Sequence, residues 1–309
     1  MNSTTSTKLK EILRSSELSQ EQLAYKLGVS FSTLNSWVNA RSEPRAKALD
    51  AIEKLHLDVI GSSEVDLDTL ANLKKQALDN KIKVKDIIAD QKLLDKITIH
   101  LTYHTNTIEG STMTVADVKR VLEDDARVLS NKTAQEQTEA RNHRAALFYL
   151  LDELNLKGES FKWNQDIILG THLRLMNTLI SSAGKYRNHG VKIAGSRVVL
   201  ASHLRVSELM LDLIDDLNAS GNDILTNAAR QHAVFEKIHP FTDGNGRLGR
   251  LIIFIQSLKY GIVPPVIVKE RKQAYYKCLE VADTKLNCQP LELLIVESAI
   301  SFANILNSH

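Results

Sequence analysis

Apolar residues recur at helical spacing along almost the whole chain, within runs rich in Leu, Ala, Lys and Glu. This period of about 3.6 residues predicts a mainly α-helical protein. One segment differs: residues 191–200, V-K-I-A-G-S-R-V-V-L, read as two short β-strands with Gly195 and Ser196 as the turn. Because an isolated hairpin is only marginally stable, we expect this one to be packed or functional.

The first sixty residues contain four short helical patterns. The first includes the apolar residue Leu9, and Ser19 and Ser30 are candidate N-caps of the second and third. Pro44 opens the fourth. These patterns predict a small helical domain over residues 1–60.

A polar linker, residues 61–66, separates this domain from a larger helical one, residues 67–309. In the larger domain the apolar spacing predicts helices at about 67–86, 98–110, 139–151, 167–179 and 290–306. A charged connector without helix is expected at 123–138.

The most unusual stretch is His239 to Arg250, H-P-F-T-D-G-N-G-R-L-G-R, which lies between two apolar helical patterns. Pro240 disfavours helix at His239, and two glycines allow a tight turn whose N–H groups face a common concavity. The second helix is expected to start at about Asn245 to Arg247, so the positive end of its dipole faces the same point. Such a concavity favours a polyphosphate.

The side chains of this loop are those that phosphoryl or nucleotidyl transfer requires. His239 is a candidate base, Asp243 a candidate metal ligand, and Asn245 an amide for orienting phosphate. Arg247 and Arg250 lie three residues apart on one helical face. An ordinary turn has no reason to gather five such residues. The spacing G-x-G-x-x-G within the loop is not a dinucleotide-binding fingerprint, because a helical pattern precedes it where a strand is needed.

These twelve residues resemble the signature of the Fic family, H-P-F-x-[D/E]-G-N-G-R-x-x-R, at every specified position, and the similarity extends from about residue 65 to the C-terminus. The resemblance implies an all-helical Fic-type catalytic core at about 139–309 with a β-hairpin flap. It also implies transfer of AMP from ATP to a hydroxyl group of a protein, with His239 as the base and Mg²⁺ bound at Asp243. The residues that it assigns to ATP are Phe241, Asp243, Gly244, Asn245, Gly246, Arg247, Arg250, Val191, Lys192, Ile193, Tyr275 and Tyr276.

Thr105 to Gly110, T-N-T-I-E-G, resembles the inhibitory motif [S/T]-x-x-x-E-[G/N] that accompanies many Fic domains. Its position upstream of the core marks the second class of the family and places it on the predicted helix at about 98–110. The resemblance implies that Glu109 pairs with Arg250, so that Arg250 cannot hold the γ-phosphate. It also allows the reverse reaction, removal of AMP. The alternative is that Glu109 is only an exposed acid at a helix end.

Residues 18–44 resemble the repressor-like helix-turn-helix family, in which the third helix enters the major groove of DNA. The residues expected to face DNA are Phe31, Ser32, Thr33, Asn35, Ser36, Asn39 and Arg41. Residues 1–60 hold eight Lys or Arg and seven Asp or Glu, a net charge of +1, which is small for a DNA-binding domain. A homodimer would double the contacts. The alternative is a small helical bundle that binds protein.

Composition sets few limits on function. A formal net charge of +2 over 309 residues indicates no particular partner. The polar N-terminus and the lack of an eighteen-residue apolar run predict neither a signal peptide nor a membrane span. Cys278 and Cys288 show no metal-ligand spacing, and two unpaired thiols suit a reducing compartment, so a cytoplasmic location is expected.

Three functions stay open on the sequence alone. The first is a repressed adenylyltransferase that also binds DNA. The second is a transcription regulator whose Fic domain only senses a nucleotide, although a sensor would have no need of His239. The third is transfer of UMP, phosphate or phosphocholine, which depends on details of the base pocket.

Overall fold

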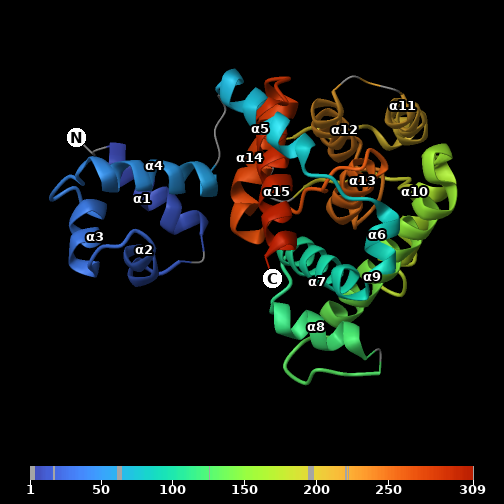
Figure 1. Cartoon of the computed structure of the whole chain (residues 1–309), viewed down its shortest axis with the longest axis horizontal. Helices are drawn as coiled ribbons and strands as arrows, with labels where there is room; N and C mark the ends of the chain where they lie inside the picture. Colours follow the sequence, from blue (N-terminus) through green and yellow to red (C-terminus); the bar gives the residue numbers. More distant parts are fainter. Residues whose placement is uncertain are drawn as a thin grey trace. The chain divides into compact units, whose positions relative to one another are not determined.

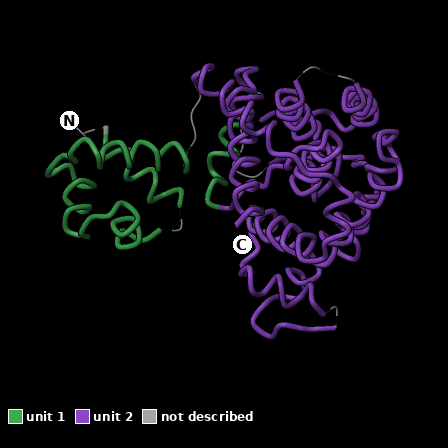
Figure 2. The backbone as a smooth tube through the Cα atoms, in the orientation of Figure 1, with its two compact units in different colours: residues 1–64, 270–278 green, residues 65–269, 279–309 purple. Residues whose placement is uncertain are grey.

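The computed structural model describes residues 4–16, 18–60, 65–124, 126–193, 198–219, 221 and 223–308. The chain divides into two compact units, residues 1–64 with 270–278 and residues 65–269 with 279–309 (Figure 2). In the described residues of both units the secondary structure is almost entirely helical (Figure 1). The prediction of a mainly α-helical protein is therefore confirmed.

The N-terminal unit contains the four predicted helices, α1 (Thr4–Ser15), α2 (Gln20–Lys26), α3 (Phe31–Val38) and α4 (Ala46–Ile60). Ser19 and Gln22 form a capping box at the start of α2, and Ser30 accepts a hydrogen bond from the Thr33 N–H at the start of α3. Gly28, at φ 67°, allows the turn between these two helices. The caps predicted from the sequence therefore set both helix starts.

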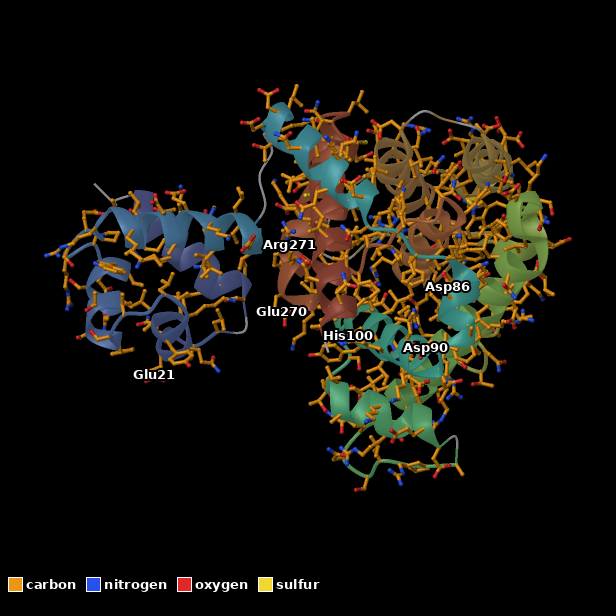
Figure 3. The ribbon with its side chains drawn as sticks, viewed as in Figure 1. Glu21, Asp86, Asp90, His100, Glu270 and Arg271 are labelled. Atoms are coloured by element: carbon orange, nitrogen blue, oxygen red, sulfur yellow. The ribbon has the colours of Figure 1, made fainter. Side chains whose placement is uncertain are left out.

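A separate apolar core holds this unit together. The core side chains come from all four helices and include Leu9, Leu23, Leu34, Trp37 and Ile52. Polar residues of the same helices face outward, such as Glu21 on α2 (Figure 3). A domain of about 60 residues is small but large enough to fold around one such core.

The larger unit is built from longer helices. They are α5 (Leu67–Asp79), α6 (Val84–Ala89), α7 (Gln91–Ile108), α8 (Val115–Glu123), α9 (Ala134–Lys157), α10 (Gln165–Leu175), α11 (Val206–Asn218), α12 (Ile224–Ile238), α13 (Asn245–Lys259) and α15 (Gln289–Asn307). Short 3₁₀ helices lie at Gly158–Ser160, His203–Arg205 and Lys269–Arg271, and α14 (Lys272–Thr284) falls across the boundary between the units.

Two expectations about this unit were wrong. The single helix at 67–86 is two helices, because Ile82 and Lys81 leave the helical path to pair their backbone with Gly261 and Ile262. The connector at 123–138 is already helical from Ala134, because Thr133 and Glu136 form a capping box that starts α9.

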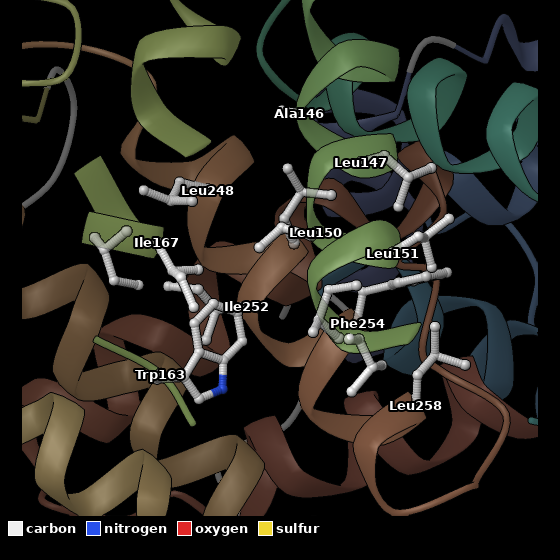
Figure 4. Close-up of a cluster of buried hydrophobic side chains, with 14 of the residues drawn as sticks. Ala146, Leu147, Leu150, Leu151, Trp163, Ile167, Leu248, Ile252, Phe254 and Leu258 are labelled. Atoms are coloured by element: carbon white, nitrogen blue, oxygen red, sulfur yellow. The ribbon is translucent and has the colours of Figure 1, made fainter. Parts of the chain in front are cut away.

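The centre of the larger unit is α13, which packs against α9, α10, α12 and α7. Leu248 and Ile252 of α13 meet Trp163 and Ile167 in a buried apolar cluster (Figure 4). Within this cluster the Trp163 indole N–H donates to Gln256 Oε1 at 2.8 Å. Since α13 is buried along almost its whole length, its N-terminal end is held firmly in place.

The predicted flap lies partly outside the described residues, because its turn falls on 194–197. The described residues on either side, 191–193 and 198–200, carry no regular secondary structure.

One helix of the described chain, Gln289–Asn307, is long and apolar enough to cross a membrane by length and composition. Its apolar window is 56% buried inside the protein, as expected of a core helix, and it packs against α5 and α12.

Candidate active site

The loop between α12 and α13 has the predicted position. α12 ends at Ile238, and His239 follows in the left-handed conformation at φ 48° and ψ 61°. Gly244 is also left-handed, at φ 81°, and α13 begins at Asn245. A left-handed residue other than glycine is strained, and more so before proline, so the surrounding structure must hold His239 in place.

Side chains bonded to backbone atoms keep the loop rigid. The Asn245 amide accepts from the Phe241 N–H and donates to the Phe241 carbonyl, both at 2.9 Å. The Phe241 ring stacks on His172, with centroids 3.6 Å apart. His172 Nδ1 accepts from the Gly184 N–H, so its Nε2 carries the proton that is donated to the Asp243 carbonyl at 2.9 Å. Burial lowers the pKa of His172 to about 4, which keeps this ring neutral.

Two of the residues predicted to bind ATP make these contacts. Phe241 was assigned to ATP, and its ring is completely buried against His172. Asn245 was expected to orient phosphate, and both ends of its amide are engaged with the Phe241 backbone. Both side chains therefore hold the loop together, and their contact with ATP stays a prediction.

His239 is oriented as a proton acceptor. Its Nδ1 lies 3.2 Å from the Glu236 carbonyl, which can only accept, so Nδ1 carries the proton and Nε2 has the free lone pair. Burial is the main cause of a lowered pKa for His239, and the charge of Arg187 adds to it. The imidazole is therefore neutral at physiological pH.

Arg187 was not assigned a role from the sequence. Its side chain is buried, 4% exposed, behind the loop that carries His239. The guanidinium donates to the carbonyls of His239 at 2.7 Å, His189 at 2.9 Å, Ala201 at 2.5 Å and Ile238 at 3.2 Å. Its backbone N–H donates to the Pro240 carbonyl at 2.9 Å.

A cradle for an anion lies at the start of α13. The first N–H groups of a helix have no intrahelical partners and carry the positive end of the dipole. Arg247 is buried beside them, and among the described residues its Nε and Nη1 make no hydrogen bond. Its two terminal nitrogens lie 3.6 Å from Glu139 and 3.4 Å from Asp243. Because buried guanidinium nitrogens are rarely left unsatisfied, they fit a bound phosphate.

Asp243 is the only carboxylate of the loop, and its side chain is 59% exposed. The described residues contain no group of three or more side chains able to hold a metal ion by themselves. Mg²⁺ in nucleotide sites needs only one or two carboxylates, since substrate phosphates and water complete its ligands. A single exposed aspartate beside an anion cradle fits that mode.

Glu109 occupies the cradle. It is the C-cap residue of α7, and its Oε1 accepts from Arg250 Nη2 at 2.6 Å. Thr105, one turn earlier, holds the same guanidinium through its hydroxyl at 2.6 Å and its carbonyl at 3.2 Å. A Cβ placed on Gly246 would collide with Glu109 Oε1, so this carboxylate lies directly over the first turn of α13. Glu109 is thus where an anion would bind.

The other predicted ATP residues are less defined. Val191, Lys192 and Ile193 are described but have no regular structure. Tyr275 and Tyr276 lie on α14 with ring centroids 5.4 Å apart, in the part of α14 that groups with the N-terminal unit. Their contact with adenine stays a prediction.

The outward face of α3 carries the residues predicted to meet DNA. Leu34, Trp37 and Val38 are buried in the core of the N-terminal unit, which turns the other side of the helix to solvent. Exposed residues are Phe31, Ser32, Asn39 and Arg41, and partly exposed ones are Thr33, Asn35 and Ser36.

Comparison with protein families supports both resemblances. Residues 162–256 match the Fic/DOC family, and residues 9–56 match a helix-turn-helix family. The chain therefore joins a helix-turn-helix domain to a Fic domain.

Curated proteins and a solved structure that are similar to this chain are also named as Fic proteins. The protein adenylyltransferase fic-1 of Caenorhabditis briggsae is 33% identical over 185 residues, which are 59% of this chain and 36% of that protein. The protein adenylyltransferase Fic of Nematostella vectensis is 27% identical over 88% of this chain and 61% of its own length. The structure of Fic-1 (residues 134–508) from C. elegans aligns with a TM-score of 0.64 and 26% identity over 93% of this chain and 79% of that one. This chain thus covers less than two thirds of the length of each of these two curated relatives.

Proposed function

We propose that this protein transfers AMP from ATP to a Ser, Thr or Tyr hydroxyl group of a protein. The observation that carries the proposal is His239, whose unprotonated Nε2 stands beside a cradle of backbone N–H groups and a buried arginine. A base next to a polyphosphate cradle is what nucleotidyl transfer needs. The adenylyltransferase relatives support AMP as the group transferred.

In the proposed reaction, the target hydroxyl loses its proton to His239 Nε2 while its oxygen attacks the α-phosphorus of ATP. The bond between the α-phosphorus and the bridging oxygen breaks, and pyrophosphate leaves. Gly246 and Arg247 stabilise the charge on the phosphates through their N–H groups. The Gly244 N–H donates instead to Asp243 Oδ1, at 2.6 Å. When bound at Asp243, Mg²⁺ would neutralise part of that charge.

Glu109 represses this reaction in the proposed scheme. Its carboxylate binds the Arg250 guanidinium and occupies the space over Gly246. The γ-phosphate therefore can neither bind Arg250 nor occupy that space. One guanidinium fork cannot hold a carboxylate and a phosphate together. With Glu109 in place, the proposed scheme also allows hydrolytic removal of AMP, in which water attacks the phosphorus of the modified target, the bond to the target oxygen breaks, and free AMP and the target hydroxyl are released.

The test is incorporation of labelled AMP by purified full-length protein, with and without cell lysate. Glu109→Gly should incorporate more label than the parent, and adding His239→Ala should abolish the gain by about 100-fold or more. Glu123→Gly is the matched control, because Glu123 ends α8 on the surface and lies 3.7 Å from Lys119. Label from UTP in place of ATP would favour a different nucleotide, and ATP binding without any transfer would favour a nucleotide sensor.

DNA binding by the N-terminal unit is a second proposed function, favoured by the match to a helix-turn-helix family and by the exposed face of α3. We propose that the protein binds two half-sites as a homodimer. Selection from random duplexes should enrich one sequence for the full-length parent, with affinity that falls steeply with salt. Asn35→Ala should weaken that binding, and failure to enrich any duplex would favour protein contact instead.

A further inference from the structure

Arg187 joins three parts of the larger unit through backbone carbonyls. Ile238 and His239 end α12, where helix carbonyls lack intrahelical partners and favour a cation. His189 and Ala201 flank residues 191–200, where the flap was predicted. One guanidinium therefore ties the chain at residues 189 and 201 to the end of α12 that carries the base.

The hold on His239 is direct. His239 is left-handed before Pro240, a strained backbone state that persists only where neighbouring contacts support it. Arg187 supplies those contacts through the His239 carbonyl at 2.7 Å and the Pro240 carbonyl at 2.9 Å. Ala201 adds one more tie, because its N–H donates to the Lys237 carbonyl at 3.1 Å.

We infer that Arg187 is a positioning residue for the proposed transfer, which fixes the backbone of His239 and with it the place of Nε2. This inference rests on the proposed function, since His239 is the proposed base. Arg187 itself donates and accepts no proton in the reaction. Its planar fork is what the site uses, because a lysine ammonium cannot reach four carbonyls that are spread around one plane.

The experiment compares Arg187→Ala and Arg187→Lys in the Glu109→Gly background of the full-length protein. ATP affinity should stay within about threefold, whereas the rate of AMP transfer should fall by about 100-fold, the scale expected for a misplaced reacting group. The matched control is Arg230→Ala, which removes a partly exposed arginine bound to Asp216 at 2.6 Å, away from the loop. It should leave both ATP affinity and rate unchanged.

Two measurements distinguish a positioning role of Arg187 from a role in folding alone. Guanidinium ions at millimolar concentration should restore part of the rate to Arg187→Ala, and none to His239→Ala. The acid limb of the rate profile should move to higher pH in Arg187→Ala, because a nearby positive charge that opposes protonation of His239 is lost. The other charged groups near His239 are Glu236, at 4.0 Å, and Asp243, with Glu109 absent in this background.

A transfer rate of Arg187→Ala equal to that of its background would overturn the inference. So would a loss of rate in Arg187→Ala with no recovery in guanidinium and no shift of the acid limb, because Arg187 would then serve folding alone. Either outcome leaves the proposed function standing as long as His239→Ala is inactive. Undiminished transfer by His239→Ala would instead remove the proposed function.

Discussion

The roles of His172 and His239 differ because their ring nitrogens have different hydrogen-bond partners. His172 uses both nitrogens on backbone groups, so it is a fixed part of the loop. His239 uses only Nδ1, on the Glu236 carbonyl, and keeps Nε2 for a ligand. Burial, the largest influence, lowers the pKa of His239, and the Glu236 carbonyl opposes that shift.

The pH dependence of transfer follows from this shift. A base with a pKa below its ordinary value of about 6.5 stays unprotonated at lower pH than a free histidine. The rate of labelled-AMP incorporation by Glu109→Gly should therefore fall to half of its plateau only below pH 6.5. The negative charge of Glu109 raises the pKa of His239, so the Glu109→Gly change lowers that pKa further. A decline centred above pH 7 would contradict it.

Sequence reasoning found residues of the site that belong to a motif and missed those that bind backbone. Glu109 and Arg250 are 141 positions apart and pair at 2.6 Å, but each was predicted because a recognisable pattern surrounds it. Arg187 and His172 bond to carbonyl and N–H groups, which every residue carries. Such partners leave no complementary residue type for a pattern to detect.

At the scale of elements, α7 restrains Arg250 at two points. Glu109 takes one terminal nitrogen, and the Thr105 hydroxyl takes Nε at 2.6 Å. Because the hydroxyl of Thr105 is one of these contacts, repression should depend on it as well as on Glu109.

Thr105→Val should therefore raise AMP transfer about fivefold, less than Glu109→Gly does. The hydroxyl is worth about 1 kcal/mol as one hydrogen bond, whereas a full switch of 2 to 3 kcal/mol corresponds to roughly 30-fold to 150-fold. Thr98→Val is the control, because the hydroxyl of this buried threonine of α7 donates to the Leu94 carbonyl of its own helix. Equal rates for Thr105→Val and the parent would leave Glu109 as the sole restraint.

The outward face of α3 carries no charged side chain. Phe31 is its first residue and is 44% exposed, at the end of the helix that such domains place against base edges. The apolar group that the major groove offers is the methyl group of thymine. Asn35 lies one turn further on the same face, and its amide suits adenine.

The selected duplex should therefore contain a thymine that Phe31 reads. Replacing that thymine with deoxyuridine removes only the methyl group and should weaken binding about fourfold per half-site, from about 0.8 kcal/mol for one buried methyl. Phe31→Ala should bind both duplexes alike. Leu57→Ala, which removes a 46% exposed leucine of α4, should keep the preference. If no thymine-to-deoxyuridine replacement changes the affinity of the parent protein, the proposed contact between Phe31 and a thymine methyl group is wrong.

Helix boundaries were predictable where a cap stands beside an apolar run. Ser19 and Ser30 each accept a backbone hydrogen bond at the expected helix start. The start of α9 was missed because its first turn is charged, although Thr133 caps it. Boundaries set by tertiary pairing, as at residues 80–83, have no local signal.

At the scale of the whole molecule, the two units have separate apolar cores and different responses to acid. The larger unit buries four histidines, and burial lowers the pKa of His104 and His172 to about 4 and that of His143 and His232 to about 3. In the N-terminal unit, His56 pairs with Glu11 at 2.6 Å and is not fully buried.

A histidine with a lowered pKa in the folded state binds a proton first in the unfolded state, below about pH 6.5. The unfolded state then carries more protons, so the stability of the larger unit should fall as pH drops from 6.5. Each group contributes up to about 1.4 kcal/mol per pH unit, so four should lower its melting temperature by on the order of 10 °C between pH 6.5 and 5.5.

Scanning calorimetry of the full-length protein at pH 7.0, 6.5, 5.5 and 5.0 measures this difference. Glu136 does not contribute between pH 6.5 and 5.5, because its carboxylate is ionised there in both the folded and the unfolded state. The ordinary pKa of a glutamate is about 4.3, and although burial raises it, hydrogen bonds from Thr112 and Thr133 bring the pKa of Glu136 to about 2. The melting temperature of the larger unit should fall with pH, while that of the N-terminal unit should stay nearly constant. The Leu34→Ala variant identifies the transition of the N-terminal unit, because it destabilises only the core of that unit. Parallel movement of both transitions would mean that the buried histidines do not set acid stability.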